Sequence, residues 1–132
     1  KISADDFFID MFETALDEGE IIIRVDFPFA DLSAYTKFPN PASRYAIVGV
    51  FVSKTPHKVR LAITGAGPMV FRSFKMEEAL CKDFSANAIK DIFIAAEDLN
   101  NDIHASEEYR AHLIHIMAKR AIDIAINKEV AR

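Results

Sequence analysis

The stretch YAIVGVFVSKTPHKVRLAI, Tyr45 to Ile63, contains the clearest β-structure in the chain. Its first half, to Ser53, is almost wholly apolar and rich in β-branched and aromatic residues. In its second half, from Val59, apolar residues alternate with more polar ones. A short polar linker with a proline joins the two halves. This pattern predicts an antiparallel β-hairpin.

Two segments before the hairpin also alternate. Residues 33–38 alternate as a predicted strand with Tyr35 and Lys37 on one side. Pro39 follows, and because proline has no backbone NH it cannot donate a hydrogen bond to a neighbouring strand. Residues 20–27 alternate in the same way and predict a further strand, ended by Pro28. Apolar residues at helical spacing predict one or two short helical turns within residues 5–16.

After the hairpin, the spacing of the apolar residues changes from the alternation of strands to the spacing of helices. Residues 76–80 predict a short helix, and Ser85 is a candidate cap for a helix running to about Glu97. Ser106 is expected to cap a longer helix, to about Asn127. The stripe expected on this last helix consists of Tyr109, Leu113, Ile116, Met117, Arg120, Ala121, Ile124 and Ala125. Strands followed by helices predict an α+β fold: an antiparallel sheet of three to four strands, helices on one face, and a long C-terminal helix.

Length and composition restrict the function. We expect a single domain over residues 1–132. The formal net charge of −4 and the lack of a basic cluster argue against a nucleic-acid partner. The apolar runs are shorter than the ~20 residues that span a bilayer. The one cysteine, Cys81, favours a reducing compartment, so we expect a cytoplasmic protein without a membrane span.

Few residues are candidates for chemistry within the chain. The TGAGP stretch, residues 64–68, lacks the third glycine of a phosphate-binding loop and is expected to be a turn. His112 and His115, with Glu108, have a spacing that permits metal ligation but matches no zinc signature. We expect Cys81 to be buried and the carboxylate pairs Asp5–Asp6 and Glu77–Glu78 to be solvated. We therefore predict no metal site and no catalytic residue.

The stretch SAYTKFPNPASRY, Ser33 to Tyr45, offers two interpretations. An aromatic ring and an ammonium group on one surface suit a flat, electron-rich ligand, with the prolines holding that surface and Arg44 in place. The alternative is an edge strand whose lysine discourages aggregation. The residues alone leave both open.

The order of several motifs resembles a known family. DFF, FETAL and GEII come first, followed by SAYTKFPNPASRYAIVGV, VRLAITGAGPMVFR, EEAL and DIHASEEYRAHLIHIMAKRAI. This order resembles the C-terminal domain of the FAD-binding medium subunit of molybdenum hydroxylases. The likeness is to the carbon monoxide dehydrogenase type, and more distantly to xanthine dehydrogenases.

The resemblance implies a flavin-capping domain in a multi-subunit oxidoreductase, not catalytic alone. The cofactor-binding residues it implies are Tyr35, Lys37, Ser43 and Arg44. The implied partners are an N-terminal FAD domain, a small subunit with iron-sulfur clusters and a large subunit with a molybdenum cofactor. Electrons would pass from the clusters through FAD to an external acceptor. The 132 residues lack glycine-rich FAD loops, so we expect this chain alone to bind FAD weakly or not at all.

A second function remains open. The chain can be a non-catalytic protein-interaction or scaffolding module that has kept the fold. Its Phe-rich start and an apolar sheet face are surfaces that would meet the FAD domain, and the isolated fragment can dimerise through them.

Overall fold

A four-stranded antiparallel sheet forms the centre of the computed structural model, which describes residues 1–130. Its strands lie in the order β3 (Leu32–Pro39), β4 (Ala46–Lys54), β5 (Val59–Thr64) and β6 (Phe71–Arg72). β4 and β5 form the predicted hairpin, with Val50 opposite Ile63 and Val52 opposite Leu61. The expected α+β fold class and its antiparallel sheet are confirmed.

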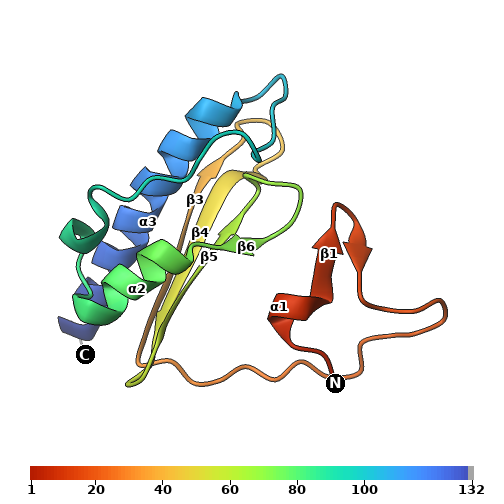
Figure 1. The fold of residues 1–132 in the computed structure, drawn as a ribbon, viewed down its shortest axis with the longest axis horizontal. Coiled ribbons are helices and arrows are strands. Elements are labelled where there is room, and N and C mark those ends of the chain that lie inside the picture. Colours follow the sequence, from red (N-terminus) through yellow and green to blue (C-terminus); the bar gives the residue numbers. More distant parts are fainter. Residues whose placement is uncertain (131–132) are drawn as a thin grey trace.

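Helices cover one face of this sheet. α2 (Phe74–Lys82) packs on β5, and α3 (Glu107–Val130) packs on β3 and β4 (Figure 1). The buried core lies between these layers and includes Val48, Val50, Val52, Leu61, Ile63, Met76, Leu80, Ile114, Met117, Ala121 and Ile122. The opposite face, which we call the open face, carries the alternate residues of the same strands. Tyr35, Lys37, Gly49, Phe51 and Arg60 lie on it.

Serines cap both α2 and α3. The Ser73 hydroxyl accepts a hydrogen bond from the Met76 amide, a cap that was not predicted. Ser106, the predicted cap of α3, accepts one from the Tyr109 amide at 3.3 Å. On α3 the stripe prediction was right for Leu113, Met117, Ala121 and Ala125, which are buried. The predicted stripe was displaced to one side. Three of its members are exposed: Tyr109, Arg120 and Ile124. Four residues outside it are buried: Arg110, Ile114, Ala118 and Ile122.

The helix expected after Ser85 is shorter than predicted. Ser85 does cap a helical turn, but that turn is η1 (Ala86–Ile89), of 3₁₀ type, and the chain then runs without helix. Ile92 and Ile94 are partly buried against the core, with Phe93 between them exposed. A run of β-branched and aromatic residues is a weak helix former, and here its alternation lets two isoleucines pack inward.

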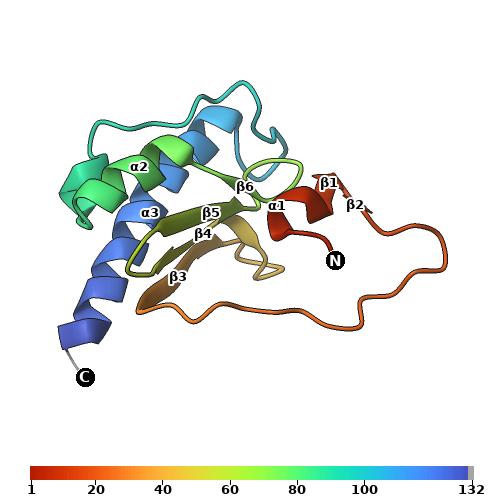
Figure 2. The ribbon, with the colours of Figure 1, turned by 60° about the horizontal axis from the view of Figure 1, so that its bottom comes forward.

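The N-terminal region differs most from expectation. A four-residue helix, α1 (Ala4–Phe7), leads into a small hairpin of β1 (Phe8–Asp10) and β2 (Glu13–Thr14). The strand predicted over residues 20–27 is absent. Residues 17–31 run as an extended connection from the N-terminal hairpin to the start of β3 (Figures 1 and 2). The alternation was real, but no strand in the described chain pairs with this segment, and its apolar side chains are exposed.

Candidate functional site

The open face carries two of the residues singled out from the sequence. On β3, Tyr35 is 47% exposed and Lys37 is also exposed, whereas Ala34, the residue before Tyr35, is buried. The Thr36 hydroxyl points the other way and donates a hydrogen bond to the Met117 carbonyl of α3 at 2.8 Å. The predicted placement of Tyr35 and Lys37 on one side of β3 is therefore confirmed. Their role in binding a ligand stays a prediction.

Two residues of β4 complete the surface around Tyr35. Phe51 lies opposite Tyr35 and is exposed, and Gly49 lies opposite Lys37. The phenol end of Tyr35 extends over Gly49, so close that a Cβ atom there would meet the Tyr35 hydroxyl at 2.4 Å. Sequence reasoning missed both residues of β4, although a glycine inside an otherwise β-branched strand is a signal for close approach of another group.

The turn after β3 is held mainly by Asn40. Its side-chain Oδ1 accepts hydrogen bonds from the amides of Ala42 and Ser43, at 2.9 and 3.2 Å. Its backbone NH donates to the Tyr45 carbonyl at 2.7 Å. We expected the prolines to stiffen this loop; the hydrogen bonds come from the buried asparagine between them. An Asn-Pro pair is a known turn signal, so the sequence contained this information.

The turn links Arg44 to Lys37. Arg44 has a φ of 63°, a left-handed conformation that costs a non-glycine residue roughly 1–2 kcal/mol. In this conformation its carbonyl accepts a hydrogen bond from the Lys37 Nζ at 2.9 Å. The structure thus brings Lys37 and the backbone of Arg44 together. Ser43 serves the turn itself, because its hydroxyl accepts a hydrogen bond from the Tyr45 amide at 3.3 Å.

A buried arginine fixes the sheet behind this turn. Arg110, near the start of α3, donates from Nη1 to the carbonyls of Ile47 and Gly65, at 2.7 and 3.0 Å. Its Nη2 donates to Asp102 at 2.8 Å. Backbone NH groups of His104 and Ala105, together with Arg110, lower the pKa of Asp102. This cluster ties the helix layer to the strand ends that border the turn.

The TGAGP stretch is a turn at the end of β5, as predicted. Gly65 has a φ of 78°, and a Cβ there would meet the Ala46 carbonyl oxygen at 2.4 Å. Both facts require glycine for the backbone path, with no phosphate needed to explain it.

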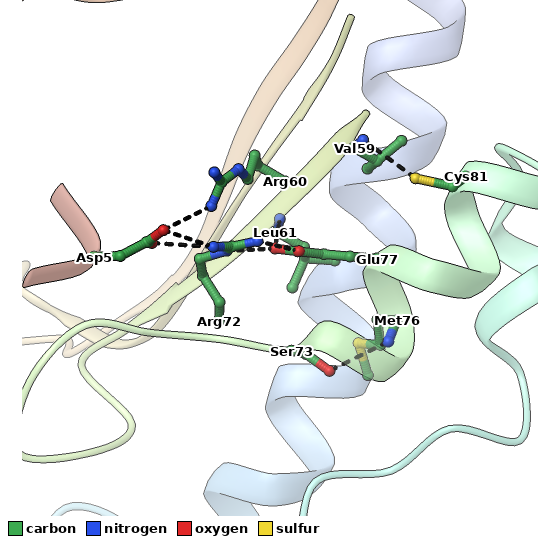
Figure 3. Close-up of polar contacts among 9 residues, drawn as sticks. All are labelled: Asp5, Val59, Arg60, Leu61, Arg72, Ser73, Met76, Glu77 and Cys81. Atoms are coloured by element: carbon green, nitrogen blue, oxygen red, sulfur yellow. Dashed lines mark hydrogen bonds and ion pairs between the residues drawn. The ribbon is translucent and has the colours of Figure 1, made fainter. Parts of the chain in front are cut away.

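A chain of charged side chains runs from α1 across the β6 edge of the sheet to α2 (Figure 3). Asp5 of α1 pairs with Arg60 of β5 and Arg72 of β6, at 3.0 and 2.9 Å. Arg72 also pairs with the buried Glu77 of α2, and this pairing raises the pKa of Arg72. Glu77 Oε1 also accepts the Leu61 amide at 2.8 Å. The expectation of solvation was wrong for Glu77, which is buried beside Arg72. It was right for Asp5, which is exposed although it pairs with two arginines.

Other predicted sites change as well. Cys81 is exposed, not buried, and its Sγ accepts a hydrogen bond from the Val59 amide (Figure 3). His115 is buried, stacks on Phe93 and has its Nδ1 3.2 Å from the Ile92 carbonyl, whereas His112 is exposed. Among the side chains that the structure describes, those of residues 1–127, no group of three or more His, Cys, Asp or Glu could hold a metal ion.

Two hollows lie near the surface around Tyr35. A groove of about 410 Å³ lies beside it, between Lys37 and Thr36 of β3 and Arg120 and Asp123 of α3. A second hollow, of about 170 Å³, lies between the turn at Ser43 and the Asp102–Arg110 pair. Tyr35 lines neither of them. An exposed ring on a flat sheet face can cover one side of a planar ligand but cannot enclose it.

Comparison with known proteins identifies the family. The family described as CO dehydrogenase flavoprotein C-terminal domain matches residues 33–125, more than half of the chain. The chain belongs to this family. The family region includes all of the four-stranded sheet except Leu32, the first residue of β3, and most of α3.

Two relatives extend the match. The carbon monoxide dehydrogenase medium chain of Hydrogenophaga pseudoflava is 27% identical over 94% of this chain and 47% of its own length. The crystal structure of quinoline 2-oxidoreductase from Pseudomonas putida 86 superposes with a TM-score of 0.73 at 24% identity, over 97% of this chain and 48% of the other. The chain thus spans about half the length of the relatives it matches, and the second likeness concerns the fold.

No helix in residues 1–130 is long and apolar enough to cross a membrane.

Proposed function

We propose that this chain is the flavin-capping domain of the FAD subunit of a molybdenum hydroxylase. The observation that carries the proposal is the Tyr35 ring, exposed beside the Lys37 ammonium group on the sheet face opposite α2 and α3. The family match and the medium-chain relative support a flavoprotein context.

The exposed residues fit one side of a flavin. The Tyr35 ring supplies an aromatic surface for stacking, with Phe51 beside it on β4. Lys37 supplies a positive charge whose position is restricted by its bond to the Arg44 carbonyl. FAD, held in the full subunit, would supply the electron-transfer chemistry between the iron-sulfur clusters of a small subunit, in an enzyme whose large subunit carries a molybdenum cofactor, and an external acceptor. Lys37 would stabilise negative charge that develops beside it.

The rest of the flavin site would come from another domain. The family's FAD-wrapping half corresponds to sequence that these 132 residues do not contain, and the chain matches about half of each relative. The exposed apolar side chains of the N-terminal region would meet that domain. They are Phe8, Ile9, Met11, Phe12, Ile21, Ile22, Ile23, Val25, Phe27 and Phe29.

Joining this chain to the FAD domain of a matching subunit tests the proposal. We expect the joined protein to bind FAD tightly and the isolated chain weakly or not at all. In the joined protein, Tyr35→Ala should shift the flavin absorbance and weaken FAD binding by about two- to tenfold, as loss of an aromatic stacking partner predicts.

Tyr109→Ala is the matched control, because Tyr109 is similarly exposed, at 43%, but lies on α3. It should leave the flavin spectrum unchanged. Micromolar affinity of the isolated chain for FAD would contradict the claim that half of the flavin site lies in another domain. An unchanged spectrum in Tyr35→Ala would contradict the capping role.

The exposed apolar segment also supports the second function, a protein-interaction module. In that case the isolated chain would dimerise and the joined protein would show no flavin response to Tyr35→Ala. Sedimentation equilibrium over a range of concentrations measures the dimer. Replacing Ile21, Ile23 and Val25 by serine should abolish it if these exposed side chains form the contact.

A further inference from the structure

Gly49 lies at the centre of the open face. It is opposite Lys37 of β3 on one side and Thr64 of β5 on the other. A side chain at this position would point out of the sheet between those two residues. The space it would occupy is already filled. A Cβ atom would lie 2.4 Å from the Tyr35 hydroxyl, 3.0 Å from Tyr35 Cε2 and 2.9 Å from Thr64 Cγ2.

The backbone does not require glycine at this position. Among the described residues the glycines with positive φ are Gly19 and Gly65, so the conformation of Gly49 is open to any residue. Glycine inside a strand costs roughly 0.5–1 kcal/mol relative to alanine. The neighbouring positions of β4 are valines that bury fully. Space for the Tyr35 phenol therefore explains the glycine, and backbone geometry does not.

We propose that Gly49 is a positioning residue for the flavin-facing surface, an inference that rests on the proposed function. Because Gly49 has no side chain, the Tyr35 phenol can lie over the backbone of Gly49, which is opposite Lys37 in the sheet. With any larger residue the phenol end must leave β4. The aromatic surface and the ammonium group would then no longer present a common face to a planar ligand.

Gly49→Ala tests this idea in a form that should still fold. The atoms in the way are the far end of an exposed tyrosine and a threonine methyl, both of which can move. We expect the Tyr35 ring to shift while the sheet stays intact. The double variant Gly49→Ala/Thr64→Ser removes one of the two obstacles and provides a second test if the single variant is unstable. Thr64→Ser alone is its control.

The position of the ring can be read without any cofactor. The 132-residue chain has three tyrosines, Tyr35, Tyr45 and Tyr109. In a sample labelled with ¹³C at the tyrosine ring, Gly49→Ala should move the resonances of Tyr35 and leave those of Tyr109 unchanged. Gly67→Ala is the matched glycine control, since a Cβ there would meet Phe71 and not a tyrosine. Unmoved Tyr35 resonances in both Gly49 variants would overturn the inference.

FAD binding by the joined protein then separates the inference from the proposed function. We expect Gly49→Ala to weaken FAD binding about two- to tenfold, as Tyr35→Ala does, with no further loss when Gly49→Ala and Tyr35→Ala are combined. A loss in Tyr35→Ala but none in Gly49→Ala would overturn the role of Gly49 and leave the capping function intact. If the ring moves in Gly49→Ala but neither variant changes FAD binding, the capping function fails, and this inference fails with it.

Discussion

The two faces of the central sheet are made by the same strands but differ in burial and in the polarity of their side chains. On the covered face, Val50, Val52, Leu61 and Ile63 are fully buried under α2 and α3. On the open face, the alternate positions carry an exposed tyrosine, a lysine, a phenylalanine and an arginine around a glycine. Alternate residues of one strand can therefore have different roles: those on the covered face stabilise the fold, and those on the open face are available for binding. Substitutions on one face should change stability, and those on the other should change binding.

Replacing one residue on each face gives the largest expected contrast. Leu61→Ala removes a fully buried side chain opposite Val52 and should cost about 2–5 kcal/mol in the free energy of unfolding. Phe51→Ala, on the exposed face of the adjacent strand, should cost about 1 kcal/mol or less. Urea denaturation of both variants measures this. Similar losses would show that the open face also contributes to the core.

The charge chain at the β6 edge gives a smaller contrast. Glu77→Gln removes a buried carboxylate that pairs with Arg72 and accepts the Leu61 amide, and should cost about 1–3 kcal/mol. Glu78→Gln is the control on the same helix, because Glu78 is exposed and pairs only with Lys82 in the described chain. It should change stability by less than about 0.5 kcal/mol. Equal effects of the two would mean that burial of Glu77 is unimportant.

The smallest expected effect concerns the anchor between α3 and the strand ends. The pKa of Asp102 is lowered in the folded state, so its ionised form stabilises the fold above its unfolded pKa of about 3.9. This contribution disappears as the pH falls through the lower, folded pKa. Asp102→Asn should therefore be less stable than the parent at pH 7, with a difference that shrinks below about pH 4.

Thermal unfolding between pH 3 and pH 7 measures this dependence, with Asp98→Asn as the exposed control. A stability difference that stays constant across this range would show that the charge of Asp102 has no part in the anchor.

The sequence predicted those features that depend on local pattern. The hairpin, the caps at Ser85 and Ser106 and the shared side of Tyr35 and Lys37 all follow from residue type and spacing. The strand expected over residues 20–27 failed because alternation marks a face but cannot supply a neighbouring strand. The helix beyond Ile89 failed because packing of Ile92 and Ile94 outweighed the capping signal.

The site was only partly predictable, for a different reason. Tyr35, Lys37 and the Asn40 turn lie within a few residues of one another, where sequence patterns are informative. Gly49 and Phe51 join them only through strand pairing, and Asp5 joins Arg72 across 67 positions of the chain. Contacts between distant segments leave no mark in spacing, so the structure was needed to find them.

The hydrogen bond from Thr36 to α3 helps to fix the register of β3 against β4. A slip of β3 by a single residue along β4 would exchange its two faces, turning Lys37 and Tyr35 inward and Thr36 outward. That slip would break the bond to the Met117 carbonyl and bury an ammonium group beside the core. One threonine hydroxyl thus penalises the misaligned sheet at the strand where misalignment would erase the recognition surface.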